Sequence, residues 1–199
     1  MIIGITGQTG AGKSTVCNIL SEKFNISVID ADLVAREVTN TAECRSLLKK
    51  EFGNDIEING KLDRRKLAAR AFEGREKTDR LNQITHPMII RKMLKTAKDL
   101  TADGVDKIIF DAPQLFESGL QSFCDYIVGF VADETIRKSR IMLRDGINEE
   151  VAEKRMKAGL STEFFAQNCD IVIDCDGSKP PEELAQIIYE NLPKGLAEF

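Results

Sequence analysis

The sequence, which is 199 residues long, predicts an α/β fold in which a five-stranded parallel sheet is flanked by helices. Short apolar runs, typical of buried strands, alternate along the chain with amphipathic segments of helical period. The first apolar run leads through a glycine-rich turn directly into a helix, which is the order of elements in units that build parallel sheets. A long helical stretch between the second and third runs predicts an insertion into the sheet domain.

The glycine-rich turn carries the most specific motif in the chain. Residues 7–14 read Gly-Gln-Thr-Gly-Ala-Gly-Lys-Ser and fit the phosphate-loop pattern G-x-x-x-x-G-K-[ST]. Residues 1–6 before it predict a buried strand, and Lys13 to Lys23 predict a helix. In this context the backbone amides of the loop converge on one anion beside the positive end of the helix dipole. Lys13 is then expected at the β- and γ-phosphates and the Ser14 hydroxyl on Mg²⁺, so the sequence predicts a nucleoside triphosphate site in a P-loop NTPase core.

Composition narrows the function classes. The chain has 28 basic and 32 acidic residues and a net charge of −4, so we expect no general attraction to nucleic acid or to anionic membranes. Its five cysteines form no C-x-x-C pair, which favours reduced thiols over a disulfide or zinc framework. We find no signal peptide and no apolar run near the roughly 18 residues of a membrane span. A cytoplasmic protein is expected.

The second predicted strand, Ile26 to Asp30, ends in two candidate acids, Asp30 and Asp32. Residues at the carboxyl ends of strands in open α/β sheets face the ligand crevice. An aspartate there is suited to deprotonate an attacking hydroxyl or to hold the metal indirectly. Capping of the following helix is the expected role of one of the two. We favour Asp32 as the general base, because that work needs reach into the crevice.

Residues 41–105 show helical patterning and no convincing buried strand. The Asn59-Gly60 pair predicts a turn between short segments. The segment Thr85-His86-Pro87 predicts a helix start, because proline is favoured at the first helical position. His86, the single histidine, fits a capping or packing role as well as a substrate contact. The basic residues of this region predict mainly a solvated face, with one or two contacting an anionic acceptor.

The third predicted strand, Val105 to Asp111, closes with an aspartate in the pattern of a Walker B acid, which secures Mg²⁺ or its water shell. Tyr126 to Val131 is the fourth strand. The helix predicted after it, from Asp133 to Arg144, carries three arginines spaced three and four apart on one face, Arg137, Arg140 and Arg144.

Such an arginine stripe has two interpretations. It is either a solvated face paired with nearby glutamates or the cationic side of a mobile lid that closes over the triphosphate. We favour the lid, because phosphoryl transfer needs cations besides Lys13. A second lid helix is predicted from about Asn148. The fifth strand, Asp170 to Asp174, is followed by Cys175, at a point where a nucleotide base would rest, and a last helix spans Glu182 to Asn191.

With these residues in place, most of the chain resembles the dephospho-coenzyme A kinase family. The phosphate loop names only a superfamily. The order of Ile29-Asp30-Ala31-Asp32, His86-Pro87 and the segment Pro113 to Glu117 is far more specific. Further matching positions are Leu62-Asp63-Arg64, Asp111, Arg140, Arg144-Asp145, Arg155-Met156 and the strand from Asp170.

The resemblance implies transfer of the γ-phosphoryl group of ATP, with Mg²⁺, to the ribose 3′-hydroxyl of dephospho-coenzyme A, the last step of coenzyme A synthesis. It implies Asp32 as the base and Lys13 and Arg140 as further catalytic groups. ATP and metal would be held by the phosphate loop, Gly7, Gln8, Thr9, Gly10, Ala11, Gly12, Lys13, Ser14 and Thr15, together with Asp111, Arg144 and Cys175. The acceptor would lie toward Asp32, Arg64, His86, Pro113, Leu115 and Glu117.

The resemblance also implies three domains, which agree with the pattern of predicted elements. Residues 1–40, 104–132 and 168–199 form the nucleotide-binding core, residues 41–103 the helical acceptor-binding domain, and residues 133–167 the lid. Four positions depart from the family pattern, Gln114, Arg137, Gly159 and Cys175. They bear on acceptor affinity, lid closure and base preference. ATP and dephospho-coenzyme A are the expected partners, and the chain is expected to be a monomer or a weak homo-oligomer.

Other functions compete with this interpretation. Shikimate kinases also place Asp-x-Asp after the second strand, but they carry adjacent glycines at the acceptor site and this chain has no Gly-Gly pair. A nucleoside monophosphate kinase is the other enzyme alternative. Guanine-specific switches usually carry Asn-Lys-x-Asp, and no asparagine here precedes a lysine. A pseudoenzyme that binds nucleotide without an acceptor is the remaining alternative, since function rests on the site and not on the fold.

Overall fold

The structure, a computed structural model, describes residues 1–193. Their contacts divide them into two compact units. The first, called the sheet unit, comprises residues 1–29 together with the chain from residue 104 onward, and the second, called the helical unit, comprises residues 30–103. The helix after the second strand therefore belongs by its contacts to the helical unit, whereas the sequence analysis grouped residues 1–40 with the core.

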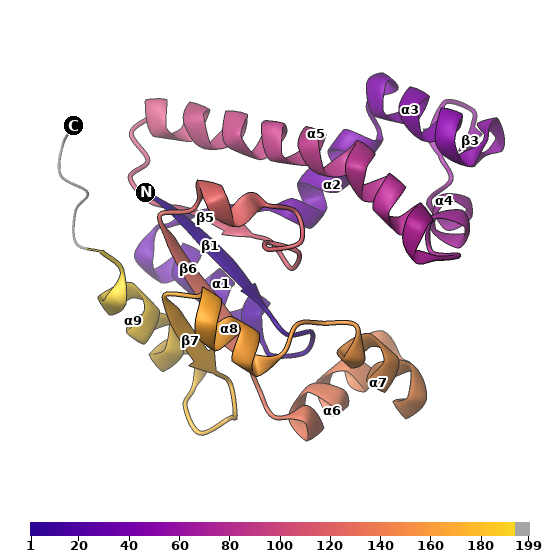
Figure 1. Cartoon of the computed structure of the whole chain (residues 1–199). Helices are drawn as coiled ribbons and strands as arrows, with labels where there is room; N and C mark the ends of the chain where they lie inside the picture. Colours follow the sequence, from indigo (N-terminus) through magenta and orange to yellow (C-terminus); the bar gives the residue numbers. More distant parts are fainter. Residues whose placement is uncertain (194–199) are drawn as a thin grey trace. The chain divides into compact units, whose positions relative to one another are not determined.

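A five-stranded parallel sheet forms the centre of the sheet unit (Figure 1), which confirms the predicted fold class. The strand order is β2-β5-β1-β6-β7. The strands are β1 (Ile2–Gly7), β2 (Ser27–Asp30), β5 (Ile108–Asp111), β6 (Tyr126–Val131) and β7 (Ile171–Asp174). All five predicted strands are present, with ends that differ by up to three residues. The central position of β1 places the loop that follows it between the carboxyl ends of β5 and β6.

Helices cover both faces of this sheet. On one face, α1 (Lys13–Phe24) and α9 (Pro181–Asn191) pack on each other and on Ile3, Ile5 and Phe130. On the other face, α8 (Thr162–Asn168) contacts β6 and β7. A Cβ at Gly129 would lie 2.8 Å from the Cys169 sulfur and 3.3 Å from Phe165 Cβ. Side chains of successive strand residues point to opposite faces, and a glycine at this position lets α8 approach the sheet closely.

Two further helices, α6 (Glu134–Asp145) and α7 (Glu149–Lys157), form a hairpin after β6. Its own small apolar core consists of Ile141, Ala152 and Met156. Lys138 on α6 pairs with Glu149 and Glu153 on α7. This α6–α7 hairpin is therefore a compact body held by its own contacts. The predicted second lid helix is α7, capped by Asn148, whereas α8 was missed by the sequence analysis because seven residues are too few for a clear helical period.

The helical unit is built around one long helix, α5 (Arg75–Ala102), which contacts three others. These are α2 (Ala31–Thr39), α3 (Ala42–Phe52) and α4 (Arg64–Ala71). A short 3₁₀ turn, η1 (Asn54–Ile56), leads into a two-residue hairpin, β3 (Glu57–Ile58) and β4 (Lys61–Leu62). The predicted Asn59-Gly60 turn joins them, with both residues at positive φ, as two-residue hairpin turns require.

The prediction of a helix start at Thr85-His86-Pro87 is wrong, because Pro87 lies inside α5. A proline within a helix removes one backbone hydrogen bond and costs about 3 kcal/mol. The 28-residue helix tolerates this cost because it packs against α2, α3 and α4, and Thr85, Met93 and Ala97 on it are buried. The Thr85 hydroxyl donates to the Leu81 carbonyl at 2.9 Å, so it bonds back along the helix and caps nothing.

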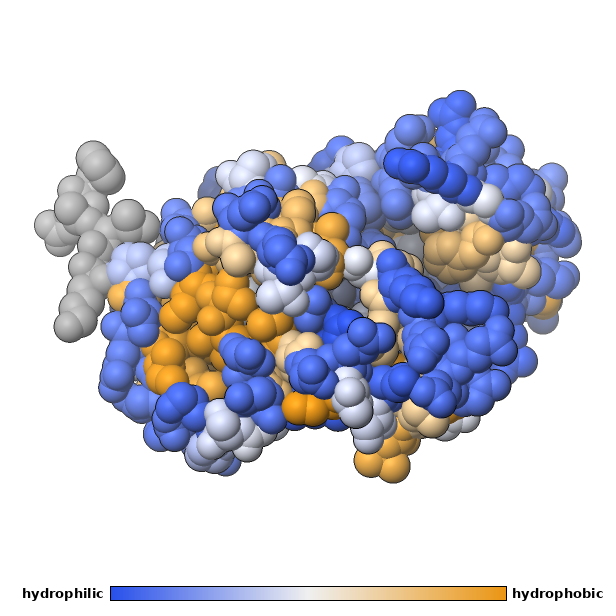
Figure 2. Space-filling view, turned by 60° about the horizontal axis from the view of Figure 1, so that its bottom comes forward, coloured by the Kyte–Doolittle hydropathy of each residue, from blue (hydrophilic) through white to orange (hydrophobic). Residues whose placement is uncertain are grey.

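The face of the molecule drawn in Figure 2 is mostly hydrophilic. Figure 2 shows apolar residues gathered mainly on the side of the sheet unit that carries its last strand and helices. β7 is the edge strand of the sheet, and Ile171 and Val172 on it are partly exposed. Within residues 1–193, no helix combines the length and the apolar character that crossing a lipid bilayer requires.

Candidate active site

The phosphate loop lies between β1 and α1 and is fixed by close packing. A Cβ at Gly7 would lie 2.5 Å from the Phe130 carbonyl oxygen, and one at Gly10 would lie 2.8 Å from the Arg137 carbonyl oxygen. Gly10 and Gly12 also have positive φ, 83° and 103°. A β-carbon is disfavoured on both grounds, so these glycines allow β6 and α6 to pack directly on the loop.

The loop presents backbone donors without acceptors. Gly12 is the N-cap residue of α1 and makes no side-chain capping bond. Among residues 1–193, no protein group accepts a hydrogen bond from the amides of Gly10, Gly12, Lys13 or Ser14. Amides at a helix N-terminus next to positive-φ glycines form an anion-binding concavity. The geometry therefore provides a site for a phosphate group at the position predicted from the motif.

Lys13 and Asp111 form an ion pair across the top of the sheet, between α1 and the carboxyl end of β5. Asp111 pairs with Ile5 in the strand register, so it lies directly beside the strand that leads into the loop. Ser14 is exposed at the start of α1. The cation, the carboxylate and the hydroxyl expected around a nucleotide phosphate and its metal thus lie on neighbouring elements of one unit.

In nucleotide sites Mg²⁺ is usually bound by only a few protein oxygens, and its other ligands are phosphate oxygens and water. Within residues 1–193, no cluster of three or more His, Cys, Asp and Glu side chains is arranged to hold a metal on its own. Ser14 and Asp111 supply a hydroxyl and a carboxylate, which are hard oxygen donors. This small donor set fits a metal whose remaining ligands come from the nucleotide.

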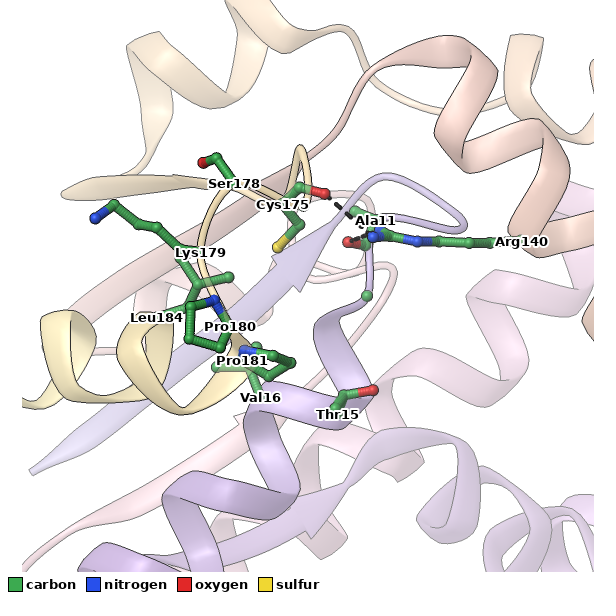
Figure 3. Close-up of a pocket in the computed structure, with 12 residues that line it drawn as sticks. Ala11, Thr15, Val16, Arg140, Cys175, Ser178, Lys179, Pro180, Pro181 and Leu184 are labelled. Atoms are coloured by element: carbon green, nitrogen blue, oxygen red, sulfur yellow. Dashed lines mark hydrogen bonds between the residues drawn. The ribbon is translucent and has the colours of Figure 1, made fainter.

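A cavity of about 510 Å³ opens beside the loop. Figure 3 shows its walls, which come from the start of α1, from Arg140 on α6, from the segment between β7 and α9 and from the first turn of α9. The lining includes Ala11, Gly12, Thr15, Val16, Arg140, Cys175, Gly177, Ser178, Lys179, Pro180, Pro181 and Leu184. Cys175 lies in this cavity, where the sequence predicts a base-binding position. Pro180, Pro181 and Leu184 were not predicted as part of the site, although two prolines at the start of the last helix are a signal for a rigid wall.

Cys175 is 5% exposed. Burial raises the pKa of its thiol to about 11, with Asp174 and Asp176 acting in the same direction and Arg140 opposing them. Desolvation disfavours the thiolate, so the side chain is a neutral, polarisable part of the wall at physiological pH.

The three arginines of α6 have different surroundings. Arg140 donates to the Ala11 carbonyl at 2.8 Å, to the Cys175 carbonyl at 3.3 Å and to the Gly10 carbonyl at 3.4 Å, as the dashed lines in Figure 3 show in part. Arg137 is 8% exposed, and burial lowers its pKa. Arg144 is exposed and pairs with Asp145. One arginine therefore lies at the loop and the cavity, one is buried, and one faces solvent.

The segment Pro113 to Glu117 follows β5 in the sheet unit. The Thr6 hydroxyl donates to the Pro113 carbonyl at 3.2 Å, which ties the segment to the end of β1. Pro113, Gln114 and Glu117 are exposed, whereas Leu115 is fully buried beneath Gly4. The exposed members are available to a ligand, and the Leu115 side chain supports the segment from the core.

In the helical unit, Asp30 caps α2 by accepting from the amides of Asp32 and Leu33 at 2.7 and 3.0 Å. The prediction that one of the two aspartates is a helix cap is confirmed, and it is Asp30. The Asp32 side chain is exposed. Arg64 donates to the Arg36 carbonyl and the Thr39 hydroxyl, both at 3.0 Å.

His86 is partly buried on α5 and takes part in an interaction.

Comparisons with known proteins identify the family to which the chain belongs. The family model described as Dephospho-CoA kinase matches residues 1–180. The chain is 43% identical over 175 residues to a Dephospho-CoA kinase from Fusobacterium nucleatum subsp. nucleatum, covering 87% of this chain and 89% of that one. It is similar to the crystal structure of TT1252 from Thermus thermophilus, at 28% identity and a TM-score of 0.81 over 98% of both chains.

The fold is also similar to Dephospho-CoA kinase from Campylobacter jejuni, with a TM-score of 0.60 and 22% identity over 95% of this chain and 96% of that one. At this identity the likeness concerns the fold.

Proposed function

Because the chain belongs to the dephospho-CoA kinase family, we propose that it transfers the γ-phosphoryl group of ATP to the ribose 3′-hydroxyl of dephospho-coenzyme A. The products are coenzyme A and ADP, and the reaction is the final step of coenzyme A synthesis. The observation that carries the proposal is the phosphate loop, in which the amides of Gly10, Gly12, Lys13 and Ser14 have no protein acceptor within residues 1–193. The Lys13 side chain of the loop lies beside Asp111. A shikimate kinase, a nucleoside monophosphate kinase and a switch are not favoured by the family assignment.

The donor site is proposed to use the loop amides and Lys13 for the β- and γ-phosphates, where charge develops during transfer. The cavity beside Thr15, Cys175 and Pro181 has a size suited to the base and ribose. Arg140 already contacts the loop and lines this cavity. It is therefore proposed to bind the triphosphate of the nucleotide or the edge of its base. Arg144 is proposed as a second lid cation, supported by its place one turn further along the same helix.

Mg²⁺ is proposed as the cofactor, held by Ser14 and through Asp111, and when bound it would neutralise charge on the phosphates. Asp32 is proposed as the base that accepts the hydroxyl proton. This assignment is supported by the role of the other aspartate after β2, because the Asp30 carboxylate caps α2. Arg64, His86, Pro113, Leu115 and Glu117 are proposed on the acceptor side, with Leu115 acting by holding its segment in place. The helical unit is proposed as the acceptor domain and the α6–α7 hairpin as the lid.

The five cysteines are free thiols, which supports a reducing compartment such as the cytoplasm. We further propose that the chain acts as a monomer or a weak homo-oligomer, which size-exclusion chromatography over a range of concentrations would test.

The test is a coupled ADP-release assay with Mg·ATP and four parallel conditions, namely dephospho-coenzyme A, shikimate, AMP and no acceptor. ADP release that depends on dephospho-coenzyme A, with a product one phosphoryl group heavier by mass spectrometry, supports the proposal. Tight ATP binding without acceptor-dependent release would instead favour a pseudoenzyme. Repeating the active condition with EDTA and then restoring Mg²⁺ tests the cofactor.

A further inference from the structure

One side chain of the phosphate loop connects the two ends of the α6–α7 hairpin. The side-chain amide nitrogen of Gln8 donates to the Thr162 hydroxyl at 3.2 Å and to the Leu160 carbonyl at 3.4 Å, just after the hairpin. The side-chain oxygen of Gln8 accepts from the amide of Ala132 at 3.5 Å, just before the hairpin. The bond to Thr162 is the shortest of the three and within the usual range.

The main chain of Gln8 is itself fixed to the sheet. Its amide donates to the Phe130 carbonyl at 2.8 Å, and its carbonyl accepts from the Ala11 amide at 3.0 Å. Gly7, the preceding residue, is packed against Phe130. The side-chain amide therefore starts from a backbone that moves only with the phosphate loop.

The residues between the two attachment points form the compact α6–α7 hairpin described above, with its own core and its Lys138 ion pairs. The hairpin also packs on the loop at Gly10, and Arg140 donates hydrogen bonds to the carbonyls of Gly10 and Ala11. Arg140 can exchange these carbonyls for a phosphate oxygen, because a guanidinium prefers a charged acceptor. The Gln8 contacts involve no group of the proposed nucleotide site other than the loop itself.

We propose that Gln8 is a positioning residue that holds both ends of the α6–α7 hairpin at the phosphate loop, so that Arg140 is kept in reach of the nucleotide. This inference rests on the proposed function for the identity of the nucleotide. A carboxamide suits the role because it donates and accepts from one neutral head group, whereas a glutamate cannot donate to the Leu160 carbonyl. With the hairpin ends held in advance, less conformational entropy is lost when nucleotide binds.

The decisive variants are Gln8→Met, which keeps the length of the side chain without its amide, and Thr162→Val, which removes the best acceptor at an exposed position. Thr162→Ser keeps the hydroxyl and is the matched control. We expect hydrogen exchange of the segment 133–160 without nucleotide to become about five- to tenfold faster in the first two variants, the scale of one or two neutral hydrogen bonds. Exchange in β1 and β5 should be unchanged.

The KM for ATP and the dissociation constant of the non-hydrolysable analogue AMP-PNP should rise by a similar factor in Gln8→Met and Thr162→Val, with a smaller change in kcat. In Thr162→Ser, both the hydrogen exchange of the segment 133–160 and the binding of ATP and AMP-PNP should stay at wild-type values. In the double variant Gln8→Met with Thr162→Val, the dissociation constant of AMP-PNP should rise by less than the product of the two single increases. The reason is that both substitutions remove the same hydrogen bond. Exchange and AMP-PNP binding need no acceptor, so they report on Gln8 even if transfer to dephospho-coenzyme A is not found.

Two outcomes would overturn the inference. Unchanged exchange of the segment 133–160 in Gln8→Met would show that the amide does not hold the hairpin. If hydrogen exchange in Gln8→Met became faster by the same factor throughout the sheet unit, Gln8 would contribute to the general stability of the unit and would not position the hairpin.

Discussion

Lys13 and Asp111 form an ion pair in which the two side chains are only 14% and 13% exposed. The pair joins the start of α1 to the end of β5 and therefore places the loop cation and the proposed metal acid side by side. Charges this far removed from water are costly unless they are paired. Each residue consequently serves the stability of the fold as well as the proposed chemistry.

Lys13→Ala should remove transfer to below about a hundredth of the wild-type rate, because a preorganised cation at the phosphates is lost. It should also lower the free energy of unfolding by about 1–3 kcal/mol, since the buried Asp111 carboxylate is left without its partner. Steady-state kinetics and urea unfolding measure the two effects.

The double variant Lys13→Ala with Asp111→Ala should recover part of the stability and none of the activity. Lys23→Ala, on the last turn of α1, is the control for loss of a lysine from this helix. A Lys13→Ala protein with near-normal turnover would contradict the donor site.

Asp32→Asn should lower kcat by about a hundredfold, the scale of general-base catalysis, while ATP binding is retained. Asp30→Asn should have little effect on turnover or melting temperature, because asparagine caps helices as well as aspartate does. Asp30→Ala should cost about 1 kcal/mol of stability. If Asp30→Asn loses turnover while Asp32→Asn keeps it, the assignment of the base is reversed.

Gly10→Ala should destabilise the protein more than Gly119→Ala does. Both glycines have nearly the same φ, 83° and 80°, so the backbone strain of a β-carbon is matched. At Gly119 a Cβ would meet nothing within 4 Å, whereas at Gly10 it would lie 2.8 Å from the Arg137 carbonyl oxygen and 2.9 Å from Ile141.

Gly119→Ala should therefore cost about 1–2 kcal/mol from conformation. Gly10→Ala should cost about 1–3 kcal/mol more, because backbone must move. Thermal unfolding of the two variants side by side is the measurement, and equal losses would mean that α6 does not press on the loop.

Alkylation of Cys175 should be slow at neutral pH and should rise with pH. With a pKa of about 11, only about one thiol in a thousand is ionised at pH 8, and the thiolate is the reactive form. Between pH 8 and pH 10 the rate with iodoacetamide should rise about tenfold per pH unit, as mass spectrometry of the labelled peptide would show.

Mg·ATP should protect Cys175 by filling the cavity that it lines, and it should leave labelling of Cys124 outside that cavity unchanged. A labelling rate that levels off below pH 9 would be inconsistent with a buried, neutral thiol.

Local patterns in the sequence determined most of the architecture. The apolar runs identified all five strands, and the phosphate loop was readable because its chemistry needs fixed residue types at fixed spacing along one strand–turn–helix unit. A helix cap at Asp30 or Asp32 could also be predicted from the sequence, because a capping side chain bonds only to amides two or three residues away.

The tertiary structure decided what depends on contacts between distant segments. Helix α5 continues through Pro87 because the packing of the whole helix outweighs the local preference of proline for a helix start. The stripe of Arg137, Arg140 and Arg144 divides into buried, loop-bound and exposed side chains because α6 lies against Gly10 on one side only. The contacts of Gln8 with Ala132 and Thr162 join residues more than 120 positions apart. A sequence pattern records the period of one element, whereas the partner of a side chain is set by which elements fold against it.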